Sequence, residues 1–149
     1  MTAKVHNYLN KHEVNGPAEG PTNWICAFVP DKNVPAKLQV GPCFLPHLAF
    51  GPYWVVAAGK SSNSTTADSE YDWALISGGV PTIPSADGHG CRTGTGVNNA
   101  GLWVFTRDSK RNNATVSAVR AIAQQKGFDT SVLMPVEQEG CKYAPSKGQ

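Results

Sequence analysis

Alternating apolar and polar residues, interrupted by glycine and proline, predict six β-strands along most of the chain. The strongest signal is YWVVAA at residues 53–58, where aromatic and β-branched side chains follow one another. Between these strands lie turn sequences such as NGP at 15–17 and PD at 30–31. The predicted strands are residues 4–10, 23–29, 36–40, 53–58, 71–77 and 101–107.

After residue 107 the apolar period lengthens from two residues to that of an α-helix. Residues 114–126 place their apolar side chains on one side, which predicts one amphipathic helix. Asn112 or Asn113 can cap its start, and Gly127 is placed to end it. The apolar side is formed by Val116, Val119, Ile122 and Ala123.

Three further segments complete the pattern. Residues 78–100 are rich in glycine and too long for an ordinary hairpin turn, so they predict a flexible hairpin lid. Residues 131–136 predict a last short edge strand, where Pro135 is tolerated because an edge strand leaves some N–H groups unpaired. Residues 142–149 predict a loose tail.

Strands followed by one helix predict an all-β fold with a single C-terminal α-helix. The expected architecture is an antiparallel up-and-down meander rolled into a barrel and covered on one side by the helix. A length of 149 residues fits a single domain, residues 1–149.

Composition narrows the possible partners. Only 16% of residues are charged and the net charge is +2, so no basic surface for nucleic acid is expected. No apolar run is long enough to span a membrane. The first ten residues, MTAKVHNYLN, lack the apolar run of a signal peptide, and whether a leader preceded Met1 stays open.

Four widely spaced cysteines without a C-x-x-C pair predict disulfides rather than a zinc site. Disulfides place the protein in an extracellular or other oxidising compartment. Four cysteines allow three complete pairings, which the sequence leaves open. Cys43 with Cys91 is a first guess, because both fall in predicted loops. The candidates are Cys26, Cys43, Cys91 and Cys141.

The glycine-rich run 88–96 is superficially similar to a phosphate-binding loop. It lacks the terminal Lys-Ser/Thr of such a loop, and it precedes a predicted strand instead of a helix. His89 and Cys91 lie two residues apart, yet the other histidines have no helpful spacing, so we predict no metal site. The same pair is too little to define a nucleophile and its base, so we predict no catalytic residues.

A series of segments follows in order along the chain: VHN, AKLQV, PYWVV, YDWALIS and GLWVFTRD, and then a helix ending in QKGFD. Together these segments resemble the lipocalins. The resemblance is to the branch of apolipoprotein D, bacterial lipocalins and bilin-binding proteins, and it covers residues 4–141. It implies an up-and-down barrel whose central cup binds or transports a small hydrophobic ligand. The implied ligands are a tetrapyrrole pigment, carotenoid, sterol or fatty acid, with no essential cofactor and no enzyme activity.

This chain departs from the family at its start. VHN resembles the third strand of the family, so the first two strands and their Gly-x-Trp motif have no counterpart here. Three arrangements are open: closure with six strands, completion of the barrel by a second chain as a homodimer or with a partner, or a fragment of a longer precursor. Unpaired edges would otherwise expose backbone hydrogen-bonding groups.

The resemblance places Asn7, Tyr53 and Trp103 in the ligand-binding cup. Strand parity alone predicts five further apolar residues in the wall of the cup: Val5, Leu38, Val55, Trp73 and Phe105.

Arg107 matches a structural arginine that in the family stacks on the Gly-x-Trp tryptophan. Without that ring it must find a carboxylate, carbonyls, or the rings of Trp24 or Trp73. Cys141 matches a C-terminal cysteine whose family partner lies in an absent strand.

Two rival functions are an enzyme on the same fold and an interaction module using exposed sheet edges.

Overall fold

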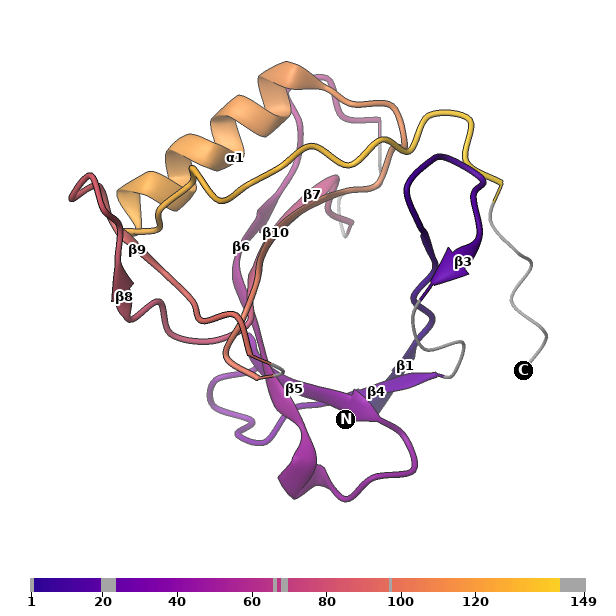
Figure 1. The fold of residues 1–149 in the computed structure, drawn as a ribbon, viewed down its shortest axis with the longest axis vertical. Coiled ribbons are helices and arrows are strands. Elements are labelled where there is room, and N and C mark those ends of the chain that lie inside the picture. The colour runs from indigo at the N-terminus through magenta and orange to yellow at the C-terminus, as the bar shows by residue number, and fades with distance from the viewer. Residues whose placement is uncertain (1, 20–23, 66, 68–69, 97, 143–149) are drawn as a thin grey trace.

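The computed structural model describes residues 2–19, 24–65, 67, 70–96 and 98–142. These form a six-stranded antiparallel sheet in the order β1-β4-β5-β6-β7-β10, which curls into half a barrel (Figure 1). Its strands are β1 (Thr2–Val5), β4 (Ile25–Phe28), β5 (Lys37–Pro42), β6 (Gly51–Gly59), β7 (Trp73–Ser77) and β10 (Leu102–Thr106). The predicted all-β fold with one C-terminal helix is confirmed at this level.

Closure by six strands does not occur among the described residues, because β1 and β10 lie at opposite ends of the strand order. The predicted first strand, 4–10, is also wrong in its length. β1 ends at Val5, and Leu9–Asn10 (β2) pairs instead with Ala18–Glu19 (β3) in a separate small hairpin. The turn in that hairpin is held by Asn10, whose side-chain amide donates to the Gly16 carbonyl oxygen at 2.7 Å.

The helix α1 (Asn113–Gln125) lies against the outer side of the sheet (Figure 1). Asn112 is its cap, since its side-chain oxygen accepts from the Thr115 N–H at 3.1 Å, and Gly127 follows the helix with φ +82°. The core lies between helix and sheet. Its fully or almost fully buried members are Leu75, Val119, Ala123 and Phe128, and Val56, Ala57, Trp73, Leu102 and Val104 pack around them.

Residues 78–100 contain the predicted hairpin, formed by β8 (Ile83–Pro84) and β9 (Cys91–Arg92). The Cys91 N–H donates to the Gly127 carbonyl at 2.8 Å, and the Asp129 N–H donates to the Cys91 carbonyl at 2.8 Å. This hairpin is therefore attached to the chain just after α1.

The edge strand predicted at 131–136 is wrong: this segment pairs with no strand in the described structure. Two hydrogen bonds change the direction of the chain at this point. The Asp129 carboxylate accepts from the Ser131 N–H, and the Leu133 N–H donates to the Thr130 carbonyl. The chain then crosses the open side of the curl toward β3 (Figure 1). There the Asn15 amide donates to the Gly140 carbonyl at 2.9 Å. Of the predicted tail, residues 143–149 lie outside the described residues.

A disulfide joins Cys26 to Cys43, with a Cα–Cα distance of 4.9 Å. Cys26 lies opposite Gly41 in the pairing of β4 with β5, which brings Cys43, two residues further on, within reach. The guessed pair Cys43–Cys91 is therefore wrong, and Cys91 and Cys141 are free thiols in this part of the chain. A disulfide is compatible with an oxidising, extracellular location.

Replacing both Cys26 and Cys43 by serine should lower the free energy of unfolding by about 3 kcal/mol, because the bond closes a loop with a separation of 17 residues. Guanidinium unfolding followed by circular dichroism measures the change. Dithiothreitol should reproduce the loss in the wild type and have no effect on the double variant. Equal stability of the wild type with and without reductant would show that the bond contributes nothing.

Candidate functional site

The inner face of the curled sheet is defined by the alternation of side chains along β10. Leu102 and Val104 pack against the core beneath α1, so Trp103 and Phe105 point to the opposite face, inside the curl. This confirms the predicted alternation of residues 101–107. The inner face is the candidate functional site.

Strand register brings five of the predicted ligand-binding residues onto this face. Trp103 and Val55 both lie opposite Ile76, and Phe105 lies opposite Ala74. Tyr53 lies opposite Leu38 on the neighbouring pair of strands. Because directly paired residues share a face, these side chains line one continuous surface. The five are Leu38, Tyr53, Val55, Trp103 and Phe105.

Two predicted residues lie elsewhere. Asn7 is exposed in the segment between β1 and β2, outside the six-stranded sheet. Trp73 lies on the outer face, packed against the core under α1, because its partner in register is Thr106. The structure thus does not bring Asn7 and Trp73 together with the other five. The predicted wall residue Val5 also lies on the inner face, since it is opposite Ile25. The same register adds Ile25, Ala27 and Val40 to this face, which parity within each strand could have indicated.

The inner face is apolar and partly open to solvent. Trp103 is 40% exposed and Phe105 is 46% exposed, although both lie in the middle of a strand. Burial raises the pKa of the Tyr53 hydroxyl, so this group is protonated at neutral pH and available as a hydrogen-bond donor.

A groove of about 350 Å³ runs along the free edge of β10. One wall is β10 itself and the other is the segment 132–136, with Val116 of α1 between them. Arg111 and Arg120 also line the groove, and none of its lining residues carries a carboxylate. The sequence does not predict this groove, because the composition of residues 131–136 predicts a strand. The available signal was the alternate apolar positions Val132, Met134 and Val136, all exposed here.

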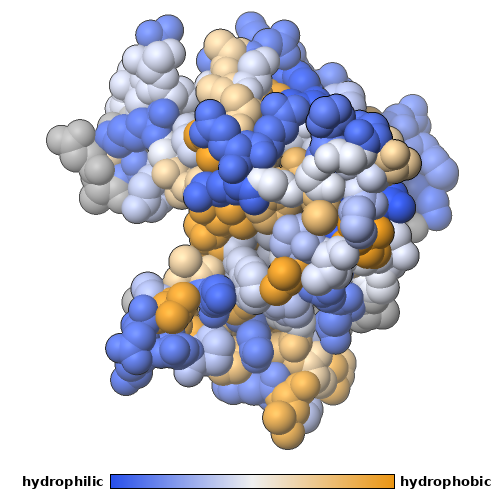
Figure 2. All heavy atoms as spheres, turned by 90° about the vertical axis from the view of Figure 1, so that its left-hand side faces the viewer, coloured by the Kyte–Doolittle hydropathy of each residue, from blue (hydrophilic) through white to orange (hydrophobic). Residues whose placement is uncertain are grey.

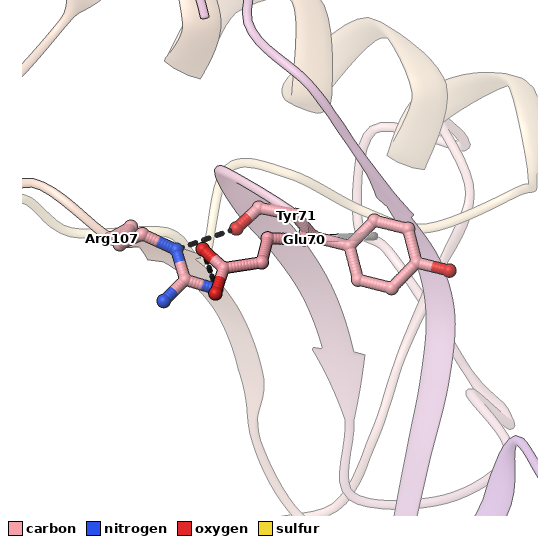
Figure 3. Close-up of polar contacts among 3 residues, drawn as sticks. All are labelled: Glu70, Tyr71 and Arg107. Carbon is pink, nitrogen blue, oxygen red and sulfur yellow. Dashed lines mark hydrogen bonds and ion pairs between the residues drawn. The ribbon is translucent and has the colours of Figure 1, made fainter. Parts of the chain in front are cut away.

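Arg107 makes polar contacts instead of stacking on Trp24 or Trp73. Its Nε donates to the Tyr71 carbonyl oxygen at 2.9 Å, and its Nη2 lies 3.8 Å from a carboxylate oxygen of Glu70 (Figure 3). The Arg107 N–H also donates to the Asp72 carbonyl at 2.8 Å. These contacts fasten the end of β10 to the start of β7, which is a structural role.

In the loop that carries His89, local hydrogen bonds hold the Asp87 carboxylate. The Asp87 carboxylate accepts from the Ser85 hydroxyl at 2.7 Å and from the backbone N–H of His89 at 3.0 Å, which lowers the pKa of Asp87. The hydrogen bond that Asp87 accepts from His89 thus comes from the backbone N–H. Within the described chain no cluster of histidine, cysteine and carboxylate groups is suited to a metal ion. Nor does that part contain a helix with the length and apolarity to span a bilayer.

The chain matches no protein-family model, no curated protein and no solved structure.

Proposed function

We propose that this protein binds a small apolar molecule on the inner face of its curled sheet, in the manner of a lipocalin. The observation that carries the proposal is the pair of aromatic rings, Trp103 and Phe105, that stay partly open to solvent on a concave apolar surface. Exposed rings at adjacent inward positions are unfavourable in water unless another molecule covers them. A tetrapyrrole, carotenoid, sterol or fatty acid has the apolar area to do so.

Burial of the ligand supplies the binding energy, at about 25 cal/mol per Å² of apolar surface removed from water. The rings of Trp103 and Phe105 offer flat contact area, and Leu38 and Val55 extend the apolar wall. Tyr53 supplies the polar group, because its protonated hydroxyl can donate to a ligand carbonyl or carboxylate. The site needs no cofactor or metal to work in this way.

A second candidate function is strand addition at the free edge of β10. Among the residues that the structure describes, no strand pairs with the backbone groups on that edge, and the groove beside it could admit an extended segment. A second copy or a partner chain pairing there would continue the barrel. Arg111 and Arg120 would favour a segment that carries a carboxylate.

Native mass spectrometry of the protein purified from its own source separates these functions. A monomer or dimer that carries an extra small mass supports ligand binding and weighs the ligand. A dimer or complex without small-molecule mass supports strand addition alone. A bare monomer argues against both.

Trp103→Ala should weaken binding of an apolar probe such as retinol by about tenfold, or about 1.4 kcal/mol, because it removes the largest aromatic surface of the inner face. Fluorescence titration measures the affinity. The matched control is Trp54→Ala, because Trp54 lies opposite Ser77 on the outer face, with the Lys37 ammonium 4.5 Å from its ring. Equal losses in the two variants would contradict an inner-face site.

A further inference from the structure

A short apolar projection follows β5 and carries side chains that the core does not use. It contains η1 (His47–Ala49) and extends from the end of the molecule opposite α1 (Figure 1). Phe44 is 77% exposed and Leu48 is 100% exposed, with Leu45 beside them more than a third exposed. We call Phe44, Leu45 and Leu48 the apolar tip. Figure 2 shows apolar surface at the same lower end of the molecule.

The apolar tip is held in a defined conformation at both ends. The disulfide of Cys43 fastens its start to β4, and the buried ring of Phe50 fastens its end. Between them, the Leu45 N–H donates to the Pro42 carbonyl at 2.9 Å and the Ala49 N–H donates to the Pro46 carbonyl at 2.9 Å. The conformational entropy of presenting these side chains is therefore already lost in the folded protein.

One side chain of the projection makes a ring contact with the sheet although it stays exposed. The His47 ring stacks on Phe28 of β4, with a centroid distance of 4.0 Å. That contact uses the one polar side chain of η1 and leaves Leu48 pointing to solvent. The full exposure of an apolar side chain is the reverse of what burial in the protein alone would favour.

One lysine lies beside the base of the apolar tip. The stretch of sequence that carries the tip, residues 32–67, contains no aspartate or glutamate, although Asp31 directly precedes it. Lys4 lies opposite Cys26 in the pairing of β1 with β4, so it shares the outer face with the disulfide at the base of the tip. An anionic surface could approach this end without meeting a carboxylate from that stretch.

We propose that the apolar tip docks this protein onto the surface of a phospholipid membrane. The occupant is a lipid surface because the tip is convex: no residue of η1 is buried, and a fluid bilayer can close around a protruding Phe44 and Leu48. A rigid protein partner would need a matching cavity. Lys4 faces the phosphate headgroups, which adds attraction to anionic lipids. Binding through so small an apolar surface is reversible.

Co-sedimentation with vesicles tests this proposal, using phosphatidylcholine alone and phosphatidylcholine mixed with phosphatidylserine. The wild-type protein should bind both and bind the mixed vesicles more tightly. The double variant F44S/L48S should lose at least about tenfold in binding, because two inserted apolar side chains are removed. Lys4→Ser should abolish the preference for phosphatidylserine. Both changes concern exposed side chains, so circular dichroism should be unaltered.

The matched control is Tyr71→Ser, which removes an aromatic side chain that is 61% exposed but lies two residues before β7, away from the tip. It should bind vesicles like the wild type. The proposal is overturned if the wild type binds neither vesicle, or if Tyr71→Ser loses as much binding as F44S/L48S. It is also overturned if F44S/L48S only converts a dimer to a monomer on gel filtration, since the tip then contacts a second copy. Trp103→Ala should keep vesicle binding, which separates this test from that of the inner face.

Discussion

Replacing Leu75 by alanine should lower the free energy of unfolding by about 4 kcal/mol, the largest effect expected of any single truncation in the core. Leu75 is fully buried in β7, between Val104 of β10 and the α1 residues Val119 and Ala123. The substitution removes its transfer free energy and leaves a cavity that the surrounding strand and helix cannot fill without moving. Urea unfolding followed by tryptophan fluorescence measures the loss.

Leu48→Ala is the matched control, since it makes the same chemical change at a side chain that is 100% exposed. Its free energy of unfolding should stay within about 0.5 kcal/mol of the wild type. If Leu75→Ala cost no more than Leu48→Ala, then α1 would not be packed on the sheet in solution. The comparison therefore tests the position of the helix as well as the core.

The location of the core explains why fold and binding should be separable. Leu75, Val119, Ala123 and Phe128 all lie on the outer side of the sheet, beneath or next to α1. The inner face contributes little to this cluster and keeps Trp103 and Phe105 partly exposed. Truncation on the outer side should therefore reduce stability first, and truncation on the inner side should reduce ligand affinity first.

Patterns that depend on near neighbours in the sequence could be predicted. The alternation of residues 101–107 gave the right faces because a strand has a period of two whatever it packs against. The helix was predictable in its extent, cap and end because Asn112 and Gly127 act within one turn.

Features that depend on distant neighbours could not be predicted in the same way. Parity alone places Trp73 in the apolar wall, and only its register with Thr106 shows that it faces the helix. The disulfide required the pairing of Cys26 with Gly41, which no local pattern contains. Residues 131–136 have a strand-like composition, yet the turn at Asp129 directs them away from β10.

The candidate site was predictable as a set of inward apolar positions but not as a shape. Its open side follows from the strand order, in which β1 and β10 are the two end strands and do not pair with each other. The crossing segment is joined to the small hairpin through the side chain of Asn15, whose φ of 61° is a left-handed turn conformation. A single polar side chain in a turn carries no sequence signal for a contact with Gly140.

Replacing Gly78 by alanine should also lower the free energy of unfolding by about 4 kcal/mol: about 3 from steric overlap and about 1 from a weakened hydrogen bond. A Cβ at Gly78 would overlap the carbonyl oxygen of Ala100 and come within 2.6 Å of its carbonyl carbon. Both are backbone atoms, so relief requires the chain to move away from the end of β7. That movement would strain the bond from the Gly78 N–H to the Gly101 carbonyl, now 3.0 Å long.

Gly96→Ala provides the control within the same glycine-rich segment, because its Cβ would meet only the Asn98 carbonyl oxygen at an ordinary 3.6 Å. Thermal unfolding of the two variants should show a large fall in Tm for Gly78→Ala and almost none for Gly96→Ala. Equal Tm values would mean that residues 98–101 do not lie against β7 in solution. The entry into β10 would then be loose, and the free edge and inner rings of that strand would lose the fixed position on which both proposed binding functions depend.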